Sequence, residues 1–154
     1  MISVENKQTY GLRIDDQAYV ATDPMITGQQ LLDMAGKRPS DQFLVYQLLQ
    51  SGQMESLRPD EIVDLRQSGI EKFLTFESDR TFFFTLDGRK FEWPAAVITG
   101  RKLKDLAQVD PTTYEVWQEV RGAADRAIGD QELVSLEPKG TERFFTGKKT
   151  TTEG

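Results

Sequence analysis

Residues 22–39 read TDPMITGQQLLDMAGKRP, and residues 94–111 read PAAVITGRKLKDLAQVDP. The shared Ile-Thr-Gly begins at Ile26 and again at Ile98, so 98 − 26 gives a separation of 72 residues. The apolar positions that follow are repeated at the same spacing: Leu31, Met34 and Ala35 in the first stretch, and Leu103, Leu106 and Ala107 in the second. Because an internal repeat constrains the whole fold, it is interpreted before any other feature.

The repeat extends on both sides of this stretch. Upstream, an alternating series matches at the same spacing: Tyr10, Leu12, Ile14, Asp15 and Tyr19 with Phe82, Phe84, Leu86, Asp87 and Phe91. Downstream one residue is lost, and apolar positions of residues 43–73 match those of 114–144 at a spacing of 71. A period near 70 residues is too long for a solenoid and fits a small complete domain. We predict a first domain at 8–77, a second at 81–147 and a flexible tail at 148–154.

Each copy is predicted to begin with a hairpin. Apolar and polar residues alternate over residues 10–14, which is typical of a half-buried strand. Asp15-Asp16, and Asp87-Gly88 in the second copy, indicate a tight turn, because glycine and aspartate tolerate positive φ. Residues 17–21 are the expected return strand, with Tyr19 and its counterpart Phe91 facing inward.

A short helix is predicted to follow each hairpin. Thr27 has the side chain of a helix N-cap, and Gln30 three positions later completes a capping box. Thr99 retains the cap, but Lys102 replaces the glutamine, so the second box is incomplete. We expect Gly36 and Pro39 to end the first helix. The pair Asp110-Pro111 is expected to end the second.

Further strands are predicted at residues 43–49, 62–65 and 70–76, from their aromatic and β-branched content. A hairpin, a helix packed across it and then further strands define an α+β class, with two tandem β-grasp domains. A ferredoxin-like domain is the alternative, and it requires a second full helix. Pro59 and the alternation over 62–65 argue against that helix.

Composition excludes several classes of function. The 154 residues include no cysteine and no histidine, which removes thiolate metal sites and the commonest general base. Carboxylates and lysines could still act in catalysis, but we predict no catalytic residue, no metal site and no cofactor, and we do not expect an enzyme. The net charge of −6 argues against a nucleic-acid partner. No apolar run resembles a signal peptide or a membrane span, so we expect a cytoplasmic protein without a membrane partner.

Aromatic residues are concentrated at the start of the second copy. Phe82-Phe83-Phe84 and Trp93 are expected to pack its core. Strand alternation must leave part of this run exposed, so Phe83 or Trp93 is a candidate interface residue.

The segments Ile14 to Tyr19, Thr22 to Gly28 and Ala35 to Pro39, with Leu31-Leu32, are similar to the bacterial multiubiquitin family. This resemblance covers about residues 8–147 and implies ubiquitin-like β-grasp domains. It implies that other proteins supply the chemistry and that the chain is itself the substrate. The expected partners are ubiquitin-type activating and conjugating enzymes, a JAB-family peptidase and lysines of target proteins. It also implies a role in antiphage defence.

The resemblance assigns the site to the tail. The Gly154 carboxylate is the expected point of conjugation, and Thr151, Thr152 and Glu153 are the expected residues that partner enzymes recognise. Two alternatives remain open. A β-grasp scaffold could self-assemble as a homo-oligomer without being conjugated, and an enzyme could act through carboxylates.

Overall fold

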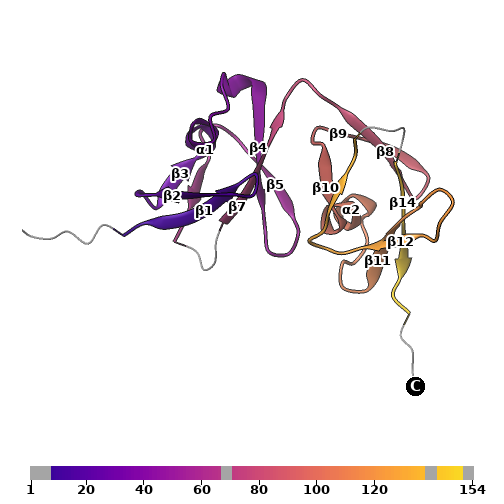
Figure 1. The fold of residues 1–154 in the computed structure, drawn as a ribbon. Helices are drawn as coiled ribbons and strands as arrows, with labels where there is room; N and C mark the ends of the chain where they lie inside the picture. The colour runs from indigo at the N-terminus through magenta and orange to yellow at the C-terminus, as the bar shows by residue number, and fades with distance from the viewer. Residues whose placement is uncertain (1–7, 67–70, 138–141, 151–154) are drawn as a thin grey trace, which may run out of the picture. The chain divides into compact units, whose positions relative to one another are not determined.

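The computed structural model describes residues 8–66, 71–137 and 142–150. The chain divides into two units, one of residues 1–49 and 55–78 and the other of residues 50–54 and 79–154. In the described residues, each unit contains a five-stranded sheet, a two-stranded sheet and one α-helix (Figure 1).

The first unit is built around a mixed sheet in the order β2-β1-β7-β4-β5. The central strand β7 pairs parallel with β1 and antiparallel with β4, and β2 pairs antiparallel with β1. A small antiparallel sheet of β3 and β6 lies beside the helix entrance. The elements are β1 (Tyr10–Ile14), β2 (Gln17–Ala21), β3 (Met25–Thr27), α1 (Gly28–Met34), a 3-10 turn η1 (Ser40–Gln42), β4 (Phe43–Leu48), β5 (Met54–Leu57), β6 (Ile62–Asp64) and β7 (Glu71–Glu77).

The second unit repeats this topology, with the sheet order β12-β11-β14-β8-β9 and a small sheet of β10 and β13. The parallel pair is β8 and β14, which corresponds to β1 and β7. The elements are β8 (Phe82–Leu86), β9 (Arg89–Trp93), β10 (Val97–Thr99), α2 (Gly100–Ala107), β11 (Tyr114–Gln118), β12 (Arg126–Ile128), β13 (Leu133–Ser135) and β14 (Glu142–Lys148). The predicted β-grasp arrangement is therefore present in both copies.

Each core lies between the helix and one face of its sheet. In the first unit, Leu31 of α1 and Phe73 of β7 are almost fully buried. Their counterparts Leu103 and Phe144 are buried in the second unit. Tyr19 packs against the first core, and the Phe91 ring stacks on Phe84 at 5.5 Å, as the alternation predicted.

The hairpin turn is hydrogen-bonded to the last strand in both units. Asp15 has φ of 52°, and its carboxylate accepts hydrogen bonds from the backbone N–H and hydroxyl of Thr75. Asp87 also has φ of 52° and accepts the equivalent bonds from Thr146, at 2.8 and 2.7 Å. The aspartates therefore stabilise both the turn and its contact with the final strand.

The Ile-Thr-Gly motif is structural in both units. Ile26 and Ile98 are buried, and the threonine hydroxyls cap their helices. The capping box is complete only in α1, as predicted. The glycine is explained by a close approach of the backbone. A Cβ at Gly28 would lie 2.4 Å from the carbonyl oxygen of Arg58.

Some boundaries differ from the prediction. Helix α2 ends at Ala107, before Asp110-Pro111, because Gln108 adopts a left-handed conformation with φ of 59°. Strands β3 and β5 were not predicted, since three or four residues are too few to show a period. Of the two candidate interface residues, Trp93 is buried and Phe83 is 40% exposed.

Candidate functional site

The C-terminal strand positions the start of the tail. Strand β14 pairs with β11 and β8, so it lies inside the sheet of the second unit. Just past its end, the backbone N–H of Lys149 donates a hydrogen bond to the carbonyl oxygen of Thr113, at 2.8 Å. The domain thus holds the chain as far as residue 149, one residue before the described part ends.

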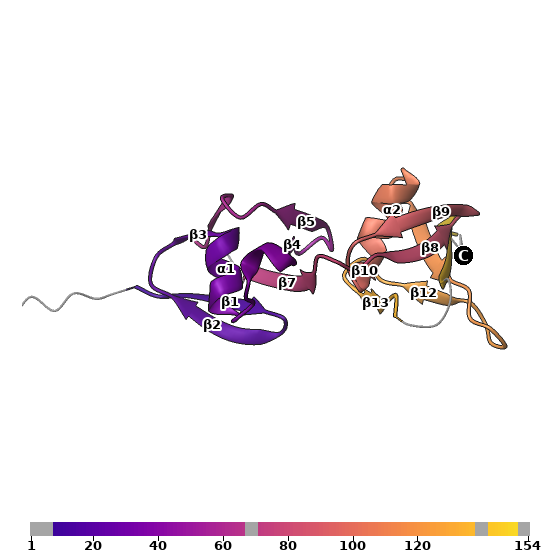
Figure 2. The same cartoon turned by 90° about the horizontal axis from the view of Figure 1, so that it is seen from above.

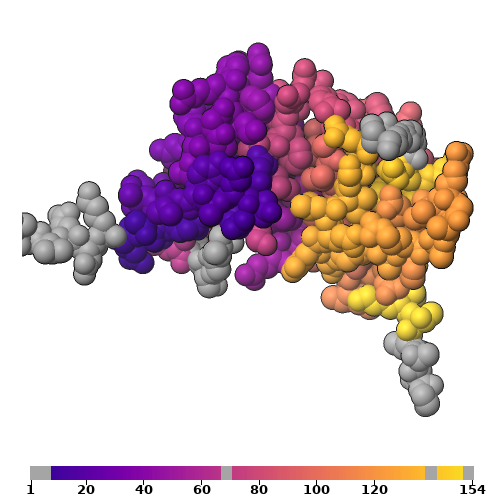
Figure 3. Space-filling view, in the orientation of Figure 1, coloured from indigo at the N-terminus to yellow at the C-terminus, as the bar shows by residue number. Residues whose placement is uncertain are grey.

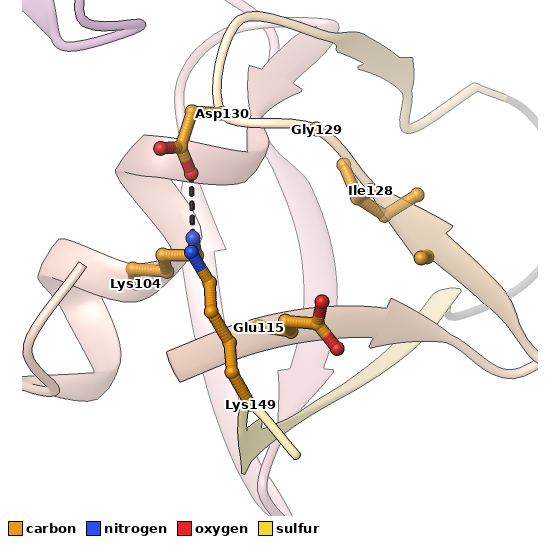
Figure 4. A pocket seen from close by; sticks show the side chains of 7 residues that line it. Lys104, Glu115, Ile128, Gly129, Asp130 and Lys149 are labelled. Atoms are coloured by element: carbon orange, nitrogen blue, oxygen red, sulfur yellow. Dashed lines mark ion pairs between the residues drawn. The ribbon is translucent and has the colours of Figure 1, made fainter. Parts of the chain in front are cut away.

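A polar pocket of about 280 Å³ opens beside this point. It lies between α2, the start of β11 and the loop after β12, and Figure 4 shows the side chains that line it. Lys149 contributes to its wall, so the pocket and the start of the tail share a residue. The lining residues are Lys104, Glu115, Ala127, Ile128, Gly129, Asp130 and Lys149.

Lys104 is the most unusual of these residues, because it is a lysine with only 3% of its surface exposed. Its ammonium lies 2.6 Å from Oδ1 of Asp130 and donates a hydrogen bond to the carbonyl oxygen of Pro111 at 3.1 Å. A buried ammonium is stable only when paired in this way. In Figure 4 the Lys149 side chain extends toward this pair, while the Glu115 carboxylate is directed away from it.

The four charged positions of this pocket are not charged in the first copy. In the second copy, the N–H of Val109 donates a hydrogen bond to the carbonyl oxygen of Lys104. In the first copy, the N–H of Lys37 donates the equivalent bond to the carbonyl oxygen of Leu32, so Leu32 is the counterpart of Lys104. By the spacing of 71, Pro59, Leu44 and Ser78 are the counterparts of Asp130, Glu115 and Lys149. An uncharged residue therefore stands at each of these four positions in the first copy.

The loop that carries Asp130 is held by a second ionic contact. Arg126 donates a side-chain hydrogen bond to Glu132, which holds the pKa of that carboxyl below its usual range. The Glu132 carboxylate also accepts a bond from the N–H of Gly129, at 3.1 Å. Both contacts favour the ionised glutamate and fix the pocket wall.

The four residues predicted as the site, Thr151, Thr152, Glu153 and Gly154, lie outside the described residues. Within the described ranges, no group of three or more acidic side chains is placed to hold a metal ion. Neither α1 nor α2, the two α-helices of that part of the chain, has the length and apolar composition needed to cross a membrane.

The sequence analysis did not identify the Lys104–Asp130 pair. A signal for it exists, since Lys104 interrupts a helix face at a position where the first copy has Leu32. Its partner lies 26 residues further on (130 − 104), in a loop without a recognisable motif, so only the fold brings the two together.

The repeated hairpin, crossing helix and parallel central strands define a protein with two tandem ubiquitin-like domains. The model of one protein family, multiubiquitin, matches residues 10–78 and again 82–149. The chain belongs to the multiubiquitin family, as the resemblance of its sequence indicated. No curated protein matches the chain.

Proposed function

We propose that this protein is a modifier that is joined to other proteins through the carboxylate of Gly154. The observation that carries the proposal is membership of the multiubiquitin family over both domains. The absence of cysteine and histidine from the whole sequence fits a protein on which partner enzymes act. The proposed setting is the cytoplasm of a bacterium, in defence against phage.

The reaction proceeds in three steps. An activating enzyme joins the Gly154 carboxylate to the AMP moiety of ATP and releases pyrophosphate. A cysteine thiolate of that enzyme then attacks the acyl carbon and displaces AMP, which gives a thioester. After transfer to a conjugating enzyme, the amine of a target lysine attacks the thioester, forms an isopeptide bond and releases the thiol.

In this proposal the chain contributes a substrate and a recognition surface. Thr151, Thr152 and Glu153 are the residues that the partner enzymes read along the tail, and a JAB-family peptidase reverses the conjugation. The charged pocket beside Lys149 favours recognition of the second domain over the first, since its charges are absent from the first copy.

The test is incubation of the full chain with its activating enzyme and ATP. We expect an adduct with the enzyme that a thiol reductant removes and that deletion of Gly154 abolishes. A matched control, Thr9→Ala near the other end of the chain, should form the adduct normally. An adduct that persists without Gly154 would show that the tail assignment is wrong.

A further inference from the structure

The two copies differ at one open edge of their sheets. Strand β2 lies at one edge of the first sheet, and its counterpart β9 lies at one edge of the second (Figure 2). The sequence of β2 is QAYVA, which contains no charge and no proline, whereas that of β9 is RKFEW. Charged residues on an edge strand discourage pairing with another chain. Only the first copy lacks this protection.

The hairpin geometry identifies the backbone groups at this edge. Asp15 and Asp16 both have positive φ and form a two-residue turn, so the flanking pair Ile14–Gln17 is hydrogen-bonded. Bonded pairs alternate along the ladder, so the N–H and C=O groups of Ala18 and Val20 point away from β1. These are the groups to which a further strand would bond.

The side chains of the same two residues are exposed. Val20 retains 65% of its surface, the highest value among the large apolar residues that the structure describes, and Ala18 is also exposed. In the space-filling view the indigo β1–β2 region lies on the surface of its unit (Figure 3). At the corresponding edge positions the second copy has Lys90 and Glu92.

The charge of the first copy indicates which kind of strand could pair with β2. Residues 10–78 contain 6 Lys and Arg against 11 Asp and Glu, a net charge of −5, whereas residues 82–149 contain 11 of each. Acidic residues stand at both ends of β2: Asp15 and Asp16 precede it, and Asp23 follows it. Arg13 forms an ion pair with Asp16 at 3.2 Å, so their charges offset each other and Asp15 supplies the remaining negative charge at this end.

A second copy of this chain fits the edge poorly. Two β2 strands paired antiparallel about Tyr19 would bring Asp16 of one chain to the Asp23 end of the other. Two units of net charge −5 would also repel each other. We propose that β2 instead pairs with an extended segment of another protein, with β-branched residues at alternate positions and Lys or Arg at its ends. This inference does not depend on the proposed function of the tail.

The test is NMR titration of the ¹⁵N-labelled full chain with three peptides. KKVTVTVKK should give saturable shifts centred on the amides of Ala18 and Val20. EEVTVTVEE should bind at least about 10-fold more weakly at low salt, with the difference shrinking at 0.5 M salt because the charges are screened. KKVTPTVKK, in which proline removes a backbone donor, should not bind.

Two variants complete the test. Ala18→Lys with Val20→Glu gives β2 the edge residues of β9, and it should abolish binding while leaving the circular dichroism spectrum unchanged. Ile62→Glu is the matched control, because Ile62 is 64% exposed and lies in β6, and it should bind normally. Deletion of Gly154 should have no effect, so failure here is distinguishable from failure of the modifier proposal.

Several results would overturn the inference. These are the absence of saturable shifts at millimolar peptide, equal binding of the proline peptide, and shifts centred away from β2. Sedimentation equilibrium of the chain without peptide tests whether a second copy of the chain occupies the edge of β2. A concentration-dependent dimer that disappears with Ala18→Lys and Val20→Glu would make the occupant a second copy of this chain.

Discussion

Replacement of Gly100 by alanine tests the physical reason for the repeated Ile-Thr-Gly motif. A Cβ at this position would lie 2.2 Å from the carbonyl oxygen of Gly129, whereas ordinary contact begins at 3.4 Å. The loop would have to retreat by about 1 Å, because close-packed interiors do not absorb such an overlap. Two backbone hydrogen bonds hold it in place: Arg101 N–H to Asp130, at 3.0 Å, and Glu132 N–H to Gly129, at 3.1 Å.

The expected loss of stability follows from these contacts. Overpacking costs about 1–3 kcal/mol, and weakening one backbone hydrogen bond costs about 0.5–1.5 kcal/mol. Alanine regains up to about 1 kcal/mol as a better helix former than glycine. We therefore expect Gly100→Ala to lower the free energy of unfolding of the second domain by about 0.5–4.5 kcal/mol.

The assay is urea denaturation followed by tryptophan fluorescence. Both tryptophans, Trp93 and Trp117, lie in the second copy, so fluorescence reports the unfolding of that domain. The matched control is Gly147→Ala, because a Cβ at Gly147 would meet nothing within 4 Å. The control should be neutral or slightly stabilising. If Gly100→Ala were as stable as Gly147→Ala, the close approach would not be the reason for the glycine.

Three further predictions concern the second domain. Lys104→Met keeps most of the side-chain length but leaves the buried Oδ1 of Asp130 without its cation, so we expect a loss of about 1–3 kcal/mol in urea denaturation. Lys148→Met, at an exposed position, should change stability by less than about 0.5 kcal/mol. Asp87→Ala and Thr146→Val should each destabilise by about 1–2 kcal/mol, and a double-mutant cycle should show coupling between them; additive losses would refute the shared hydrogen bonds. Because the folded-state pKa of Glu132 is lowered, its contribution to stability is complete above the unfolded-state pKa of about 4.3 and is lost as the pH falls through the folded-state pKa. Glu132→Gln should flatten this part of the stability profile, and an unchanged profile would contradict the assignment.

The sequence predicted the elements that have a strong local signal. Alternation revealed β1 and β8, turn residues revealed the hairpins, and the capping threonines placed the starts of both helices. The second copy strengthened the hairpin prediction, because Asp87-Gly88 is a clearer turn signal than Asp15-Asp16. Strands β3 and β5 were missed because their pairing with distant residues, rather than a local period, makes them strands.

The candidate site was less predictable from the sequence. The Lys104–Asp130 pair depends on a loop that only the folded chain brings to α2. The glycines of the Ile-Thr-Gly motif were recognised, but the approaching carbonyl oxygens of Arg58 and Gly129 belong to loops about 30 residues away. The tail residues Thr151 to Gly154 remain a prediction from the resemblance to the family.

Mass spectrometry of conjugates tests the central proposal most directly. Trypsin cleaves after Lys149, so a target lysine joined to Gly154 would keep the remnant Thr-Thr-Thr-Glu-Gly on its side chain. In cells that contain the chain and its active activating enzyme, we predict this remnant on lysines of other proteins and its loss when Gly154 is deleted. Recovery of the tail peptide from those cells only with a free carboxylate would contradict the proposal that this protein is a conjugated modifier.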